Sequence, residues 1–193
     1  MTEGIAFRTR LLGLTFGTRW PQGTSSLNAK LVRDGRNEGR ALSAESAGLL
    51  LYRQRDGKLE VLLVHPGGPF WQRRDDGVWS IPKGELAENE TGIAVARREF
   101  QEELGLPPPD GEPTALGAVR QAGGKIVHAW AVPGDLDVTR TRSNTFELEW
   151  PPRSGRVRWF PEVDRAGWFD LGAARRKRLP AQRRLIDRLE ELR

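Results

Sequence analysis

Cysteine is absent from this chain of 193 residues, which contains only two histidines, His65 and His128. Without cysteine the protein can form neither a disulfide nor a thiol nucleophile, and the lack of disulfides is typical of a cytoplasmic protein. Two histidines far apart in the sequence, with no thiolate beside them, argue against a zinc site. We therefore expect a cytoplasmic protein in which any metal ion has oxygen ligands.

The sequence also lacks a long apolar segment. No apolar run approaches the length of about 20 residues that a membrane-spanning helix needs. The pattern of a secretory signal, a charged segment followed by a long apolar stretch, is missing as well. We therefore expect no membrane partner.

The net charge of +5 comes from the two ends of the chain. Residues 1–45 carry seven Lys and Arg against four Asp and Glu, and residues 165–193 carry nine against four. Residues 46–164 carry fifteen against eighteen. A basic chain suggests a nucleic-acid partner, but the mildly acidic middle argues against one.

The pattern of apolar and polar residues along the chain changes near residue 44. Residues 1–43 show scattered glycines and no sustained helical or strand periodicity, which predicts a flexible basic N-terminal tail. Residues 44–193 are predicted to form one folded domain. It begins with apolar runs at 47–52 and 59–64, separated by the turn signal Asp56-Gly57, and this pattern predicts a β-hairpin.

Further strands are expected at 114–120 and 125–132, on either side of Gly123-Gly124, and at 156–160, where charged and apolar residues alternate. A C-terminal amphipathic helix is expected after Pro180, with an apolar face made of Leu185, Ile186, Leu189 and Leu192. Strands on both sides of a helix in the middle of the chain, with a second helix at the end, predict an α/β/α sandwich.

The middle helix lies in the most informative segment, GELAENETGIAVARREFQEELGL, residues 84–106. Thr91 is expected as its N-cap and Gly105 as its left-handed C-terminal cap. Glu99, Glu102 and Glu103 stand at i, i+3 and i+4 on one helix face, with no lysine four residues on to neutralise them. Because carboxylates held together repel unless a cation offsets them, this face predicts a bound hard divalent ion, Mg2+ or Mn2+.

A solvated acidic face is the alternative, but it leaves the fixed spacing to Gly84, Glu90 and Arg98 unexplained. A hard ion on carboxylates points to phosphate chemistry. The negatively charged oxygens of a polyphosphate repel a nucleophile that approaches phosphorus. A bound metal ion neutralises this charge and activates water for in-line displacement. A glutamate can then accept the proton of that water.

The segment resembles the Nudix box, GX5EX7REUXEEXGU, where U is aliphatic or bulky and apolar. All nine specified positions match, namely Gly84, Glu90, Arg98, Glu99, Phe100, Glu102, Glu103, Gly105 and Leu106. The resemblance implies a Nudix-type α/β/α sandwich with a mixed β-sheet over residues 44–193. It also implies cleavage of a nucleoside diphosphate linked to another moiety, by attack of water on phosphorus.

The resemblance also implies a role for each residue of the box. The matching glutamates of the family, Glu99, Glu102 and Glu103 here, ligate Mg2+ or Mn2+, often with the carbonyl of the residue that matches Gly84. The arginine matching Arg98 pairs with the glutamate matching Glu90 and orients the ligand carboxylates. Glu102 and Glu103 are the candidates for a proton acceptor inside the box.

Three residues outside the box are further candidates. Lys83 and Lys125 are expected to contact substrate phosphates as point charges, although each could instead be an ordinary surface lysine. Several Nudix hydrolases carry a glutamate shortly before an apolar, aromatic strand, where it ligates metal or acts as base. Glu162 matches that placement better than Glu147 or Glu149, and the alternative is a loop glutamate.

The Trp-Ser-Ile-Pro-Lys-Gly run at residues 79–84 and the later Gly-Gly-Lys resemble the dinucleoside-polyphosphate hydrolases. Two features depart from known branches: a tyrosine common in that branch after the box is missing, and Gln121 stands where ADP-ribose hydrolases carry a proline. We expect a small-molecule phosphoanhydride substrate, a nucleotide or dinucleoside polyphosphate. The alternatives are a nucleotide-sugar or ADP-ribose hydrolase and a non-catalytic module that binds a nucleotide or RNA, although a mere binder has little need of the full carboxylate set.

Overall fold

The computed structural model describes residues 45–86 and 89–193, so the predicted tail lies outside the described residues. The strands are β1 (Glu45–Arg55), β2 (Lys58–Pro66), β3 (Lys83–Glu85), β4 (Thr114–Arg120), β5 (Ile126–Pro133), β6 (Thr145–Glu149), β7 (Val157–Pro161) and β8 (Val163–Asp170). The α-helices are α1 (Gly92–Leu104), α2 (Leu171–Lys177) and α3 (Arg183–Glu191). Short 3-10 helices span Ala122–Gly124, Val138–Arg140 and Pro180–Gln182.

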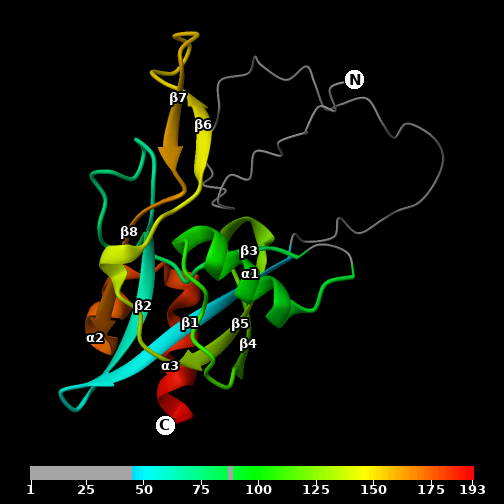
Figure 1. The fold of residues 1–193 in the computed structure, drawn as a ribbon, viewed down its shortest axis with the longest axis vertical. Coiled ribbons are helices and arrows are strands. Elements are labelled where there is room, and N and C mark those ends of the chain that lie inside the picture. The colour runs from blue at the N-terminus through cyan, green and yellow to red at the C-terminus, as the bar shows by residue number, and fades with distance from the viewer. Residues whose placement is uncertain (1–44, 87–88) are drawn as a thin grey trace.

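A six-stranded mixed sheet forms the centre of the domain (Figure 1). Its main path runs β4-β5-β1-β2-β8, and β3 also pairs with β1. β1 and β5 are parallel, whereas the other pairings in this sheet are antiparallel. The mixed sheet is therefore confirmed, as is the predicted hairpin of β1 and β2, whose turn residues Asp56 and Gly57 both have positive φ angles.

β1 and β2 pair only at the end next to their turn, and the strands then diverge. β2 pairs with Tyr52–Arg55 of β1, while β3 pairs with Ser46–Gly48 farther along the same strand. The segment before β3 fills the opening, because Val64 of β2 and Ser80 exchange backbone hydrogen bonds of 2.9 and 3.0 Å. A Cβ at Gly48 would lie 2.5 Å from the carbonyl oxygen of Pro82, so this close approach requires glycine. The divergence thus places Lys83 and Gly84 within the sheet.

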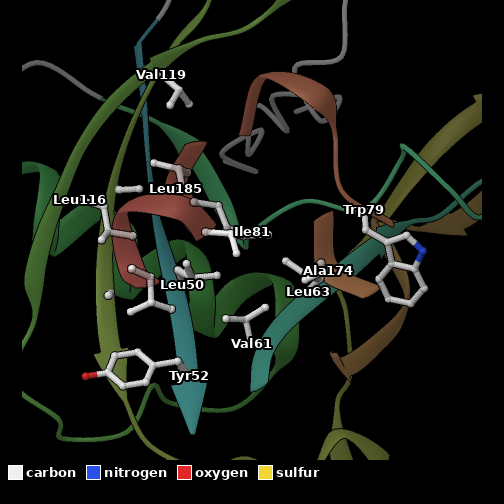
Figure 2. Packing of buried hydrophobic residues seen from close by; sticks show 14 of the residues in the cluster. Leu50, Tyr52, Val61, Leu63, Trp79, Ile81, Leu116, Val119, Ala174 and Leu185 are labelled. Atoms are coloured by element: carbon white, nitrogen blue, oxygen red, sulfur yellow. The ribbon is translucent and has the colours of Figure 1, made fainter. Parts of the chain in front are cut away.

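Helices cover both faces of the sheet, because successive strand residues point to opposite sides. Leu49 and Leu51 of β1 pack with Phe100 and Leu104 of α1. Leu50 of β1 belongs to a second cluster with residues of α2 and α3, of which Figure 2 shows Ala174 and Leu185. Two apolar layers, one on each side of one sheet, confirm the α/β/α sandwich.

Some elements differ from those expected. β7 starts and ends one residue later than predicted and pairs only with β6, in a separate two-stranded sheet that projects from the body (Figure 1). Leu185, Ile186 and Leu189 of α3 are buried as predicted, but Leu192 follows the helix and is exposed. α2 was not anticipated, because its seven residues are too short to display a helical period.

Candidate metal and phosphate site

Helix α1 begins and ends where the sequence indicates. The backbone carbonyl of Thr91 accepts the N–H of Val95 at 3.1 Å, although the Thr91 side chain makes no capping hydrogen bond. At the other end Gly105 has φ 68° and donates its N–H to the carbonyl of Gln101 at 2.8 Å. The arrangement of the glutamates therefore follows from regular helical geometry between these caps.

The glutamate face of α1 turns toward β3. Glu99 and Glu103 are buried, whereas 41 % of the Glu102 side chain is exposed. A Cβ built on Gly84 would lie 1.8 Å from Cδ of Glu99, so the Glu99 carboxyl rests against the Gly84 backbone. Glycine at this position therefore leaves the room that the carboxylate occupies.

Glu103 lies in the same place, beside the residue that precedes Gly84. The backbone N–H of Lys83 donates to the Glu103 carboxylate. The pKa of Glu103 is raised to about 8, mainly by burial; the charge of Lys83 opposes the shift, and the charges of Glu99 and Glu162 add to it. Three carboxylates and one ammonium thus interact within a single region.

Lys125 approaches this region from the other side of β1. Lys83 pairs with Gly48 of β1, and Ile126, next to Lys125, pairs with Glu45 of the same strand. Lys125 Nζ lies 3.8 Å from Glu85 Oε1. Burial lowers the pKa of Lys125 and the charge of Lys83 lowers it further, while Glu85 and Glu99 oppose the shift.

Both lysines are buried, with 3 % of Lys83 and 8 % of Lys125 exposed, so the interpretation as ordinary surface lysines is wrong. Glu85, the partner of Lys125, was missed by the sequence reasoning. Glu85 directly follows Lys83 and Gly84 in the sequence. This position indicates a contact with Lys125 only when the pairing of the strands is known.

Arg98 joins three glutamates of the box. Its Nη2 lies 3.4 Å from Glu90 Oε2, and its Nη1 donates to Glu99 Oε1 at 2.7 Å and to Glu102 Oε1 at 3.1 Å. The expected ion pair between Arg98 and Glu90 is present, and Arg98 also holds two of the candidate ligand carboxylates directly. Charge-assisted hydrogen bonds of this kind fix the orientation of both partners.

Within the described residues, no three His, Asp or Glu side chains stand close enough, as placed, to hold a metal ion. Arg98 Nη1 donates to both Glu99 and Glu102, so the carboxylates of these two residues are held at its guanidinium. The residues nevertheless suit a hard cation, which prefers oxygen ligands. Glu103 Oε2 is buried with no hydrogen-bond partner in the described structure, and a buried carboxylate oxygen of this kind is a ready ligand.

Glu162 stands at the corner between β7 and β8. Its backbone N–H donates to the carbonyl of Asn144 at 2.8 Å, and its own carbonyl accepts from Gly67 at 2.9 Å. Its charge contributes to the raised pKa of Glu103, so the two carboxyl groups interact electrostatically. Glu147 and Glu149, the rival candidates, lie on β6 of the projecting hairpin, where Glu149 Oε1 accepts the backbone N–H of Gly155 at 2.8 Å.

The sequence and the fold were compared with those of known proteins. The chain matches the family described as NUDIX domain over residues 43–189. A search of curated proteins found no match. No helix of the described residues is long and apolar enough to cross a membrane.

Several solved structures share the fold. A C. elegans Ap4A hydrolase in a binary complex is 22% identical with a TM-score of 0.53, and the match covers 77% of this chain and 96% of that one. The NUDIX domain of Shewanella oneidensis NrtR complexed with ADP ribose is 19% identical with a TM-score of 0.52, covering 78% and 88%. A mutT/nudix family protein from Listeria innocua is 17% identical with a TM-score of 0.50, covering 77% and 92%.

These identities are low, so the structural matches establish the fold alone. The family match spans well over half of the chain and includes the box on α1 with all its specified residues. The resemblance seen in the sequence is thereby confirmed, and the chain belongs to the Nudix family.

Proposed function

We propose that this protein is a Mg2+- or Mn2+-dependent hydrolase. It cleaves a phosphoanhydride bond in a nucleoside diphosphate linked to another moiety, and its preferred substrates are nucleotide or dinucleoside polyphosphates. The observation that supports this most directly is the meeting of carboxylates (Glu99, Glu103, Glu162) and buried lysines (Lys83, Lys125) where β1 and β2 diverge. Acidic oxygens suit a hard cation, and ammonium groups suit phosphate oxygens.

Glu99, Glu102 and Glu103 would hold the ion, together with the backbone carbonyl of Gly84. When bound, the ion would neutralise phosphate oxygens and lower the pKa of a coordinated water. Arg98 keeps Glu99 and Glu102 oriented through its hydrogen bonds. Since no three acidic side chains of the described residues stand close enough together to hold an ion, binding would require these side chains to turn.

Glu162 is the proposed acceptor of the proton of the attacking water. It comes from a different element than α1, so it can face the water while the glutamates of the box are engaged with the ion. Lys83 and Lys125 would neutralise the charge of the polyphosphate and align it for attack from one side.

The substrate class rests on the residues around the box. The Trp-Ser-Ile-Pro-Lys-Gly run ends in Lys83, and Gly-Gly-Lys ends in Lys125, so both sequence signals of the dinucleoside-polyphosphate branch deliver a lysine to one site. The fold shared with the C. elegans Ap4A hydrolase agrees with this choice. The second candidate is a site for ADP ribose, with or without turnover, because the NrtR domain of similar fold was solved with that ligand.

A panel of nucleoside triphosphates, dinucleoside polyphosphates, nucleotide sugars and ADP-ribose distinguishes the candidates. Each is incubated with Mg2+, with Mn2+ or with EDTA, and the phosphate products are separated by chromatography. We expect metal-dependent cleavage that is fastest with a polyphosphate, and a loss of roughly 10²-fold in Glu102→Gln and Glu103→Gln. Tight binding of ADP-ribose without cleavage of any compound would instead identify a binding module.

The role of Glu162 is tested by three matched variants. Glu162→Gln should lower kcat strongly and leave KM almost unchanged, because proton transfer matters in the transition state. Glu147→Gln and Glu149→Gln serve as controls from the neighbouring hairpin. If one control loses activity and Glu162→Gln keeps it, the role belongs to that residue; if all three are active, the acceptor is Glu102 or Glu103.

A further inference from the structure

His65, which lies outside the Nudix box at the end of β2, is fully buried and hydrogen-bonded through both ring nitrogens. Its Nδ1 is 2.6 Å from Asp164 Oδ1, and its Nε2 is 2.7 Å from the backbone carbonyl of Arg74. The backbone carbonyl of Arg74 can only accept a hydrogen bond, so Nε2 donates to it, while Nδ1 pairs with the Asp164 carboxyl. His65 therefore ties Asp164 of β8 to the loop that contains Arg74.

This pair lies at the corner that carries Glu162. Asp164 follows Glu162 by two residues, and the pairing of β2 with β8 shifts register next to His65. On the other side of Glu162, a Cβ at Gly67 would lie 1.9 Å from the carbonyl oxygen of Pro161. The end of β2 thus contacts the corner at the residues before and after Glu162, and it also binds the carbonyl of Glu162 through the N–H of Gly67.

We propose that His65 is a positioning residue: its hydrogen bond to Asp164 fixes the corner between β7 and β8, and thereby holds the Glu162 carboxylate beside Glu103. This inference rests on the proposed function, in which Glu162 accepts a proton. Proton transfer depends steeply on distance and orientation, so a small displacement of the corner slows the chemical step more than it weakens substrate binding.

His65 also packs against the core, with its ring 5.2 Å from that of Trp79 in an edge contact. A large truncation would therefore mix packing with positioning. Two amide substitutions separate the contacts, because the amide of His65→Asn places a donor near the position of Nδ1 and that of His65→Gln places one near the position of Nε2. The first retains a donor to Asp164, and the second retains a donor to the Arg74 carbonyl.

The kinetic test compares these variants in two backgrounds. In the wild-type background, His65→Gln should lower kcat about tenfold with KM within about twofold, and His65→Asn should stay within about threefold of wild type. In the Glu162→Gln background, His65→Gln should have no further effect, because the group that it positions is gone. Equal losses in both backgrounds, or equal losses in the two amide variants, would overturn the proposal.

A second readout does not depend on turnover. Amide hydrogen exchange of Gly67 in the metal-free protein reports how firmly the corner is held, since this N–H donates to the carbonyl of Glu162. His65→Gln should speed this exchange about tenfold while His65→Asn leaves it unchanged, and unchanged protection in His65→Gln would contradict the positioning role. Failure of the proposed role of Glu162 looks different, because Glu162→Gln is then as active as wild type whatever happens at His65. Failure of the proposed hydrolase function would appear as wild-type protein without metal-dependent turnover, while the exchange at Gly67 still reports on His65.

Discussion

Glu103→Gln offers a test of the site that needs no substrate. The pKa of the buried Glu103 carboxyl is raised to about 8 from an ordinary value of 4.5. Between these two pH values, the folded metal-free protein keeps a proton that the unfolded chain has lost. The stability linked to this proton is fully present below pH 4.5 and is lost as the pH rises toward 8.

The size of the effect on stability follows from the difference in the Glu103 pKa between the folded and the unfolded protein. Each pH unit in the window lowers the free energy of unfolding by about 1.4 kcal/mol, so a rise from pH 6 to pH 8 lowers it by roughly 2–3 kcal/mol. For a domain of this size that corresponds to a fall in Tm of roughly 5–10 °C. Glu103→Gln has the same shape and cannot ionise, so this part of the pH dependence should vanish.

The assay is thermal unfolding in EDTA at pH 6, 7 and 8. Glu102→Gln is the matched control, because its half-exposed side chain carries no comparable cost of burial, and this variant should keep the wild-type slope. Added Mg2+ should stabilise wild type more at pH 8 than at pH 6, since an ion binds the deprotonated carboxylate. Identical slopes in wild type and Glu103→Gln would refute the assignment of a buried, protonated Glu103.

Three further predictions concern other parts of the molecule. Arg98→Lys should reduce turnover at least tenfold with little change in Tm, because a single ammonium lacks the planar fork that holds Glu99 and Glu102 through Nη1 and Glu90 through Nη2; wild-type turnover would show that this arrangement is dispensable. Gly84→Ala should weaken Mg2+ binding, measured by calorimetry, because the new Cβ would lie 1.8 Å from Cδ of Glu99; an unchanged affinity would count against Glu99 as a ligand. Removal of residues 1–43 should leave Tm and turnover of small substrates unchanged, and unfolding of the truncated protein would place the domain boundary earlier.

Local patterns sufficed for much of the fold. The ends of α1, the hairpin of β1 and β2 and the apolar face of α3 depend on residues close together in the sequence, and the structure contains them except for a side-chain cap at Thr91 and the burial of Leu192. Alternation predicted β7 as a strand, but it did not identify β6 as its partner, because the pattern of one strand does not specify the segment that pairs with it. The box itself is also local, since one helix and the turn before it carry every specified position.

Sequence patterns selected Lys83, Lys125 and Glu162 as candidates, but they did not predict the strand pairings that bring these residues to the box. Lys83 and Lys125 are brought together because β3 and β5 both pair with the N-terminal half of β1, on opposite edges. That arrangement depends on the divergence of β1 and β2, for which Gly48 is the only local sign. The contact of His65 with Asp164 joins residues 99 positions apart, and no periodicity connects them.

The difference between Glu102 and Glu103 shows what tertiary structure adds to such a motif. Helical spacing treats the two residues alike, because both lie on the face of α1 that carries Glu99. In the folded protein Glu103 is 3 % exposed, while 41 % of the Glu102 side chain is exposed. Ionisation is therefore most unfavourable at Glu103, which is buried and interacts with the charges of Lys83 and Glu162. A cation bound there removes this cost of ionisation, so ion binding, release of the Glu103 proton and a gain in stability should occur together.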